Sequence, residues 1–119
     1  GNFVYRQRGS TATATGWTPL VVKGAIVETL LVDSEGFLYI HSGSVVYAQR
    51  GASATTSNWS PIRTRVIETA VASKTLYVLD MYGQLVRVTG PASTQLQEGY
   101  VASISVVNDT LVIISSITR

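Results

Sequence analysis

The chain contains no cysteine and a single histidine, His41, among its 119 residues. Without cysteine there is no disulfide framework and no thiolate chemistry, and the compartment in which the protein works stays open. One histidine cannot build a histidine-based metal cluster, and a lone histidine at the end of a strand is more often a packing residue than a general base. We therefore expect no enzyme activity, no catalytic residue, no metal site and no cofactor.

Charged residues are also scarce, at 13 % against a hydrophobic share of 45 %. This balance favours one packed domain over disorder. The net charge of +2 comes from nine basic and seven acidic residues that do not form a block, so we expect no general affinity for nucleic acid. The apolar runs are far shorter than the ~20 residues that a membrane helix needs, so we expect no membrane span.

What the chain does contain is an internal repeat. Residues 4–9 (VYRQRG) return 42 residues later as residues 46–51 (VYAQRG), and residues 17–20 (WTPL) return at the same spacing as residues 59–62 (WSPI). A fixed period of this length, with short alternating apolar runs, is typical of a repeated sheet unit.

The composition of the repeat predicts an all-β fold without a long helix, because Val, Ile, Leu, Thr and Tyr alternate with short Gly and Ser turns. We expect a single domain of three β-meander repeats of about 40 residues, at about residues 9–50, 51–90 and 91–119. The third lacks its last strand, which the strand at 3–8 can supply from the same chain or from a neighbouring one. The predicted strands are 3–8, 26–32, 37–41, 45–49, 66–72, 75–80, 84–88, 100–107 and 110–115.

One such unit resembles a blade of a tectonin-like or WD-repeat-like β-propeller. The segments that carry this loose resemblance are residues 17–20 (WTPL), 26–29 (IVET), 33–40 (DSEGFLYI) and 45–50 (VVYAQR). The chain has no Trp-Asp and no Gly-His pair, so the hydrogen-bond network of WD repeats is not implied. Propellers close with four to eight blades, so the resemblance implies a half-ring that closes as a homodimer. A β-trefoil or a β-prism, which close three repeats within one chain, are the alternatives.

Several side chains recur with the repeat and are candidates for binding. Trp17 and Trp59 are placed either to stack on a sugar ring or to pack between neighbouring units. The repeated arginines each end a matched strand, and the repeated glutamates, Glu28 and Glu68, lie within another matched motif. These recurring charges favour an Arg–Glu contact between sheets or capping of backbone carbonyls by the arginines, with a site for an acidic ligand as the alternative. The candidate binding residues are Trp17, Trp59, Arg8, Arg50, Tyr5 and Tyr47.

The repeat, together with the lack of catalytic motifs, predicts a non-catalytic interaction or scaffold module that self-associates and binds a protein partner. A carbohydrate-binding lectin that uses the repeated tryptophans is the first alternative. A structural component of a virion or a cell-surface assembly is the second. The three hypotheses share the same fold and differ in what the repeated units bind: a protein, a carbohydrate or other components of an assembly.

Overall fold

The computed structural model describes residues 1–7, 9, 13–89, 92–95 and 100–115. These residues form twelve β-strands and one 3₁₀ turn, η1 (Gly51–Ser53), with no α-helix in the described ranges, which confirms the all-β prediction. These described residues contain no helix that is long and apolar enough to cross a membrane. The strands are β1 (Tyr5–Arg6), β2 (Thr18–Pro19), β3 (Thr29–Val32), β4 (Phe37–Ser42), β5 (Val45–Arg50), β6 (Ser60–Arg63), β7 (Val66–Ala72), β8 (Thr75–Asp80), β9 (Leu85–Thr89), β10 (Ala92–Gln95), β11 (Val101–Val107) and β12 (Thr110–Ser115).

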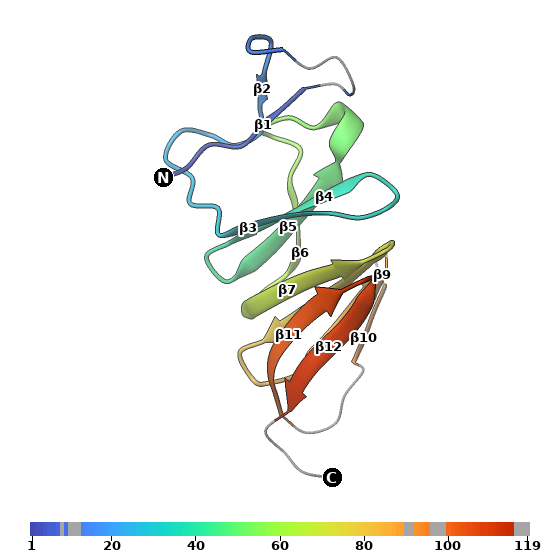
Figure 1. Ribbon diagram of the computed structural model, residues 1–119. Coiled ribbons are helices and arrows are strands. Elements are labelled where there is room, and N and C mark those ends of the chain that lie inside the picture. The colour runs from blue at the N-terminus through green and yellow to red at the C-terminus, as the bar shows by residue number, and fades with distance from the viewer. Residues whose placement is uncertain (8, 10–12, 90–91, 96–99, 116–119) are drawn as a thin grey trace.

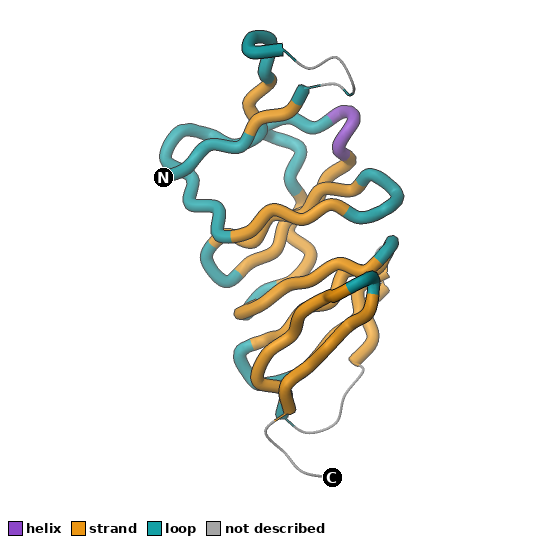
Figure 2. The backbone as a smooth tube through the Cα atoms, viewed as in Figure 1, coloured by secondary structure: helices purple, strands orange, loops and turns teal. Residues whose placement is uncertain are grey.

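Two four-stranded antiparallel sheets form the middle of the molecule, and a two-stranded sheet lies at each end (Figure 1). The first sheet has the order β3-β4-β5-β6 and the second β10-β9-β8-β7, so each strand pairs with its neighbours in sequence. We call β1–β2 the N-terminal pair and β11–β12 the C-terminal pair. The four sheets follow one another along an elongated molecule of 53 × 29 × 24 Å (Figure 2).

The turns between strands contain residues that suit a left-handed or tightly hydrogen-bonded backbone. Asn108 and Asp109 join β11 to β12 with φ values of 49° and 58°, as a two-residue type I′ hairpin requires. Two wider turns are held by aspartate side chains instead. The Oδ1 atoms of Asp33 and of Asp80 each accept hydrogen bonds from the backbone N–H groups two and four residues later. The turn chemistry thus fixes where the strands reverse.

Apolar side chains meet between the sheets in three clusters. Strand β8 contributes to two of them, because Leu76 and Val78 face the first sheet while Tyr77 and Leu79 face the C-terminal pair. The third cluster surrounds Ile40 and joins the first sheet to the N-terminal segment. The second sheet is therefore covered on both faces, whereas the C-terminal pair packs on the second sheet through one face.

The predicted strands agree well with the observed ones in the middle of the chain. Those at 66–72, 75–80 and 110–115 have the bounds of β7, β8 and β12. The fourth strands β6 and β10 are not predicted from the sequence. Strand β6 contains Pro61, which lacks a backbone N–H and is tolerated because β6 lies at the edge of its sheet. The division into three repeats stays a prediction.

Candidate functional site

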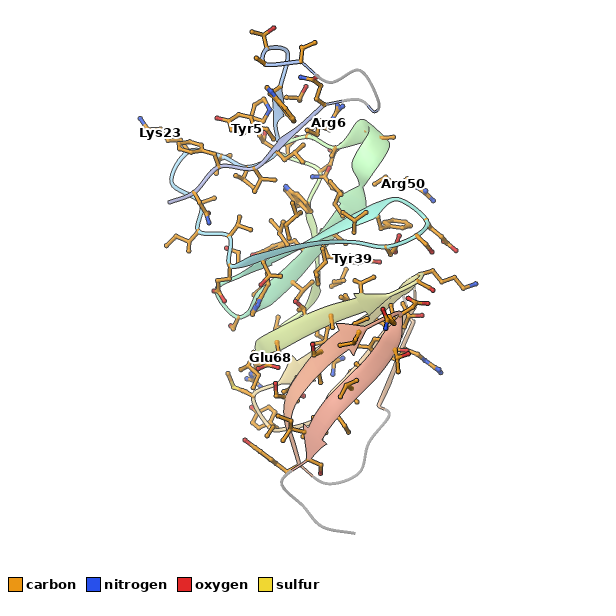
Figure 3. The ribbon with its side chains drawn as sticks, in the orientation of Figure 1. Tyr5, Arg6, Lys23, Tyr39, Arg50 and Glu68 are labelled. Carbon is orange, nitrogen blue, oxygen red and sulfur yellow. The ribbon has the colours of Figure 1, made fainter. Side chains whose placement is uncertain are left out.

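A cavity of about 450 Å³ opens between the first sheet and the β7–β8 turn. Tyr39 projects from β4 into the space between the first and second sheets, as Figure 3 shows. Polar and apolar side chains share the walls of this cavity. They are Asp33, Glu35, Phe37, Tyr39, Ala48, Gln49, Asn58, Ser60, Ile62, Lys74 and Val88.

The inner wall of the cavity is fixed by a buried hydrogen bond between Tyr39 and Asp33. The Tyr39 hydroxyl donates to Asp33 Oδ2 at 2.7 Å, while Oδ1 accepts the backbone N–H groups of Glu35 and Phe37 at 2.9 and 3.0 Å. Burial, followed by the hydrogen bond to Asp33 and its charge, raises the pKa of the Tyr39 phenol far above its ordinary value of 10.0. The phenol is thus a neutral donor at physiological pH, and the pair serves to hold the turn against the strand.

Exposed side chains in the cavity lining carry groups that can donate or accept hydrogen bonds. Glu35 and Lys74 bring opposite charges to it, and Asn58 and Ser60 add an amide and a hydroxyl. The lining contains neither histidine nor cysteine. Nowhere among the described residues do three or more His, Asp or Glu side chains come close enough to hold a metal ion. The arrangement suits binding of a small polar molecule better than nucleophilic or metal-assisted chemistry.

The two tryptophans lie at matched positions but in different surroundings. Trp59 packs in the cluster around Ile40, and its indole N–H donates a hydrogen bond of 2.7 Å to the carbonyl oxygen of Leu20. Trp17 is 48 % exposed. Trp59 therefore ties the N-terminal segment to the first sheet, whereas Trp17 presents an aromatic surface to solvent.

The repeated tyrosines differ in the same way. Tyr47 packs beside Trp59 in the cluster around Ile40. Tyr5 is exposed and stacks on the ring of Phe3, with 6.2 Å between the ring centroids. The first copy of the motif is thus open where the second copy is packed.

Arg50 does not join these aromatic residues in one site. The guanidinium of Arg50 lies 4.6 Å from the centroid of the Phe37 ring, in a cation–π contact at the end of β5. Figure 3 shows Arg50 and Tyr5 on different parts of the molecule. Arg8 lies outside the described residues. Of the five predicted binding residues that the structure describes, Trp59 and Tyr47 pack against the same cluster.

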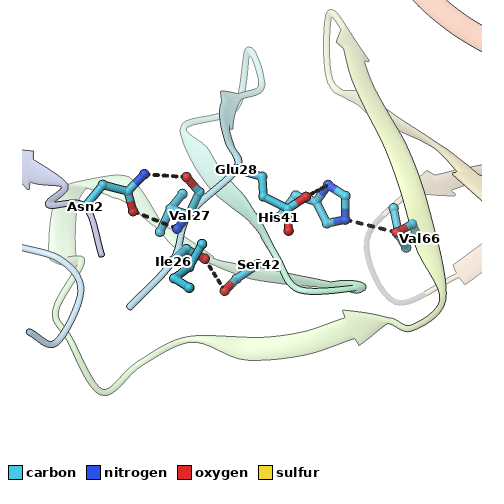
Figure 4. Close-up of polar contacts among 7 residues, drawn as sticks. All are labelled: Asn2, Ile26, Val27, Glu28, His41, Ser42 and Val66. Atoms are coloured by element: carbon cyan, nitrogen blue, oxygen red, sulfur yellow. Dashed lines mark hydrogen bonds and ion pairs between the residues drawn. The ribbon is translucent and has the colours of Figure 1, made fainter. Parts of the chain in front are cut away.

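Glu28 contacts the single histidine of the chain. Its Oε2 lies 3.6 Å from His41 Nδ1, and His41 Nε2 lies 3.0 Å from the carbonyl oxygen of Val66 on β7 (Figure 4). The buried imidazole therefore bridges the first and second sheets. This contact explains His41 as a packing and hydrogen-bonding residue, as its isolation in the sequence predicts.

Glu68 holds the next pair of sheets together. Its Oε1 accepts hydrogen bonds from the Ser103 hydroxyl at 3.0 Å and from the Ile104 backbone N–H at 2.8 Å, both on β11. Neither repeated glutamate contacts an arginine within the described ranges. Carbonyl capping, the other structural role expected for an arginine, occurs at Arg6, whose Nε donates to the Ala54 carbonyl oxygen at 2.9 Å.

A repeated pair of reciprocal hydrogen bonds between a glutamine side chain and a threonine backbone, which we call the glutamine clasp, was not predicted from the sequence. Gln49 closes the loop between β5 and β6, because its side chain donates to the Thr55 carbonyl at 2.8 Å and accepts the Thr55 N–H at 3.0 Å. Gln7 makes the same reciprocal pair with Thr13, and also donates to the Thr15 carbonyl at 2.8 Å. Both residues of the clasp recur at the 42-residue period, which is a signal that the sequence does contain.

The segment that leads into β3 is anchored by Asn2, a residue for which the sequence offers no signal. The Asn2 side chain donates to the Val27 carbonyl at 2.6 Å and accepts the Val27 N–H at 2.7 Å (Figure 4). The Ser42 hydroxyl also donates to the Ile26 carbonyl nearby. These contacts hold residues 26–28 beside β4 without a regular strand ladder.

Large apolar side chains are exposed at both ends of the molecule. Leu111 and Ile113 of β12 pack on the second sheet, so the alternation of the strand turns Val112 and Ile114 outward. Exposed apolar patches of this kind mark interaction surfaces in soluble proteins. The exposed residues at the C-terminal end are Val107, Val112 and Ile114, and those at the other end are Phe3, Tyr5, Trp17, Leu30 and Val32.

No protein-family model, curated protein or solved structure matches the chain.

Proposed function

We propose that the chain is a non-catalytic module of the β-propeller type that associates with a second copy of itself and holds a protein partner. The observation that carries this proposal is the pair of exposed apolar faces at the two ends of the stack. The C-terminal face belongs to a two-stranded sheet whose other face packs on the second sheet. The face at the other end combines residues in and beside the N-terminal pair with Leu30 and Val32 of β3.

The order of the strands supports the propeller type. Each four-stranded sheet is a simple antiparallel meander, and the sheets pack face to face through apolar clusters, as the blades of a propeller do. By closing into a ring, a propeller covers the faces of its blades and protects its strand edges. A molecule with two half-sized sheets at its ends gains from a partner that covers them.

The module is expected to work by presenting surfaces. Two polar groups that line the cavity, Asp33 and Tyr39, are already bonded to each other and act as a structural acceptor and donor. Large apolar side chains are exposed at both ends of the molecule, and burial of apolar area drives association. Binding of protein surfaces is therefore the activity that the geometry favours.

Light scattering coupled to size exclusion, over a range of concentrations, tests self-association. We expect a mass of twice the 12.8 kDa of the chain at high concentration, because each copy has two faces to cover. A mass of one chain at every concentration up to the millimolar range would contradict the proposal.

A second candidate function is carbohydrate binding, which two observations favour. Trp17 offers a half-exposed aromatic ring, and the cavity beside Asp33 gathers carboxylate, amide, hydroxyl and ammonium groups around an apolar wall. Tryptophan fluorescence titrated with a panel of sugars tests it, with Trp17→Phe and Asn58→Ala as variants that separate the two surfaces. A sugar response lost in one variant and kept in the other identifies the site, whereas no response to any sugar excludes this function.

A further inference from the structure

The C-terminal pair matches the first two strands of the second sheet. In both, a two-residue turn joins a seven-residue strand to a six-residue strand, with Ala72 opposite Thr75 in one and Val107 opposite Thr110 in the other. The strands after the turn, β8 and β12, begin with the similar sequences Thr-Leu-Tyr-Val and Thr-Leu-Val-Ile. In the second sheet β8 then pairs with β9, whereas β12 has β11 as its single partner among the described strands.

The N-terminal pair matches the other half of such a sheet. Tyr5 lies opposite Pro19 in β1–β2, and Tyr47 lies opposite Pro61 in β5–β6, so both partners are shifted by the same 42 residues. The glutamine clasp recurs at the same period, with Gln7 in one pair and Gln49 in the other. Strand β1 is thus a strand of the β5 type, whose neighbour in the first sheet is β4.

Exposed residues at the two ends of the molecule correspond to residues that pack between the first and second sheets. The Leu-Tyr pair at residues 38–39 of β4 aligns with Leu-Tyr at residues 76–77 of β8 and with Leu-Val at residues 111–112 of β12. In this alignment Val112 takes the position of Tyr39. Tyr39 is 8 % exposed because the second sheet covers it, whereas Val112 is 49 % exposed. On the N-terminal side, Val32 lies opposite Leu38 as Val71 lies opposite Leu76. Val71 packs in the cluster between the sheets, yet Val32 is exposed.

The two matching halves cannot meet within one molecule. The N-terminal pair and the C-terminal pair lie at opposite ends of the stack, which is 53 Å long (Figure 1). A second copy of the chain carries the complementary half for each, because the sequence of β1 resembles that of β5, the strand that follows β4 in the first sheet.

We propose, building on the self-association above, that β1 of one copy adds to the edge of β12 of a second copy and completes a four-stranded antiparallel sheet of the order β11-β12-β1-β2. The register follows from β4–β5, where Ile40 lies opposite Tyr47 and His41 lies opposite Val46. The same register pairs Ile113 with Tyr5, and Ile114 with Val4. Val112 then faces Val32 of the second copy, so both exposed side chains are covered.

The absence of cysteine from the chain makes this register directly testable by disulfide formation. Four variants, each with one introduced cysteine, are prepared: Ile113→Cys, Ile114→Cys, Tyr5→Cys and Val4→Cys. Opposite residues of an antiparallel pair have Cα atoms roughly 4.5 or 5.5 Å apart, within the range for a disulfide. A slip by one residue turns the side chains to opposite faces of the sheet.

Mixing the variants in pairs under mild oxidation gives a matched two-by-two test. We expect the pairs Ile113→Cys with Tyr5→Cys and Ile114→Cys with Val4→Cys to cross-link about tenfold faster than the two exchanged pairs, which use the same four proteins. Circular dichroism of each variant and the mass of each before oxidation show that it folds and associates like the unmodified chain.

The outcomes separate this inference from the proposed function. Equal rates for all four pairs, with a dimeric mass, would overturn the β12–β1 pairing and leave self-association standing through another surface. Faster cross-linking of the exchanged pairs would overturn the register. A monomeric mass at every concentration would overturn both proposals.

Discussion

The face between the first and second sheets and the outer face of the C-terminal pair are built from the same kinds of side chains and end in different surroundings. Between the sheets, Tyr39, Val46 and Val78 are buried. On the outer face, Val112 and Ile114 follow the same alternation and are exposed. The difference in exposure arises from whether a neighbouring sheet covers the face, and not from the strand itself. The outer face of the C-terminal pair therefore carries apolar side chains of the kind that are buried between the sheets.

The same contrast runs through the repeated motif at the N-terminal end. Trp59 and Tyr47 pack in a cluster, whereas their counterparts Trp17 and Tyr5 are about half exposed. Each packed member touches the preceding part of the chain. The exposed members are those that no preceding sheet covers, and the four predictions below test this contrast between packed and open surfaces.

The largest effect is expected from a charge on the outer face. Val112→Asp should weaken self-association by about a hundredfold or more, because an aspartate would have to lose its hydration on an apolar surface. Ile67→Asp, which places the same charge at an exposed apolar position of β7 outside both end faces, is the control and should change the dissociation constant little. Sedimentation equilibrium measures both, and an unchanged constant for Val112→Asp would remove this face from the interface.

A matched pair of valines tests burial in the monomer. Val78→Ala should lower the free energy of unfolding by about 2 to 3 kcal/mol, because the fully buried side chain lies between two sheets. Val112→Ala should lower it by less than about 0.5 kcal/mol. Urea denaturation at a concentration where the chain is monomeric gives both values. Equal losses would show that the outer face is not open in the monomer.

Tyr39→Phe removes the hydrogen bond to the Asp33 carboxylate and should cost about 2 kcal/mol. The pKa of the Tyr39 phenol is raised in the folded state above its ordinary 10.0, so the contribution of this group to stability is full below pH 10 and is lost as pH rises beyond it. Urea denaturation at pH 8 and at pH 11 should therefore show a smaller difference between variant and wild type at the higher pH. A difference that grows with pH would contradict the assigned role.

The smallest effect compares the two glutamine clasps. Gln49→Ala should lower the free energy of unfolding by about 1 kcal/mol, because it leaves the polar groups of Thr55 without partners at a buried position. Gln7→Ala, at the exposed copy, should cost less than about 0.5 kcal/mol in the monomer. Thermal unfolding of both variants at low concentration measures the gap. A larger loss for Gln7→Ala would mean that the N-terminal pair is as well packed as the first sheet.

The strands of the middle of the chain follow from local alternation, which is why β7, β8 and β12 can be predicted to the residue. Strand β6 cannot, because Pro61 and the polar residues around it lack a strand pattern and depend on pairing with β5. The glutamine clasp is a repeated signal that could have been recognised from its spacing. The different surroundings of Trp17 and Trp59 could not, because the two motifs are nearly identical and the neighbour that buries one of them is remote in sequence.

Amide hydrogen exchange of β12 tests the central claim most directly. An edge strand leaves alternate N–H groups without a strand partner, so these amides exchange fast in the monomer. We predict that those amides of residues 111–114 that point away from β11 exchange at least about tenfold more slowly at concentrations where the chain is dimeric, and that Val112→Asp abolishes this protection. Fast exchange at every concentration, with the amides of β8 protected, would contradict the account.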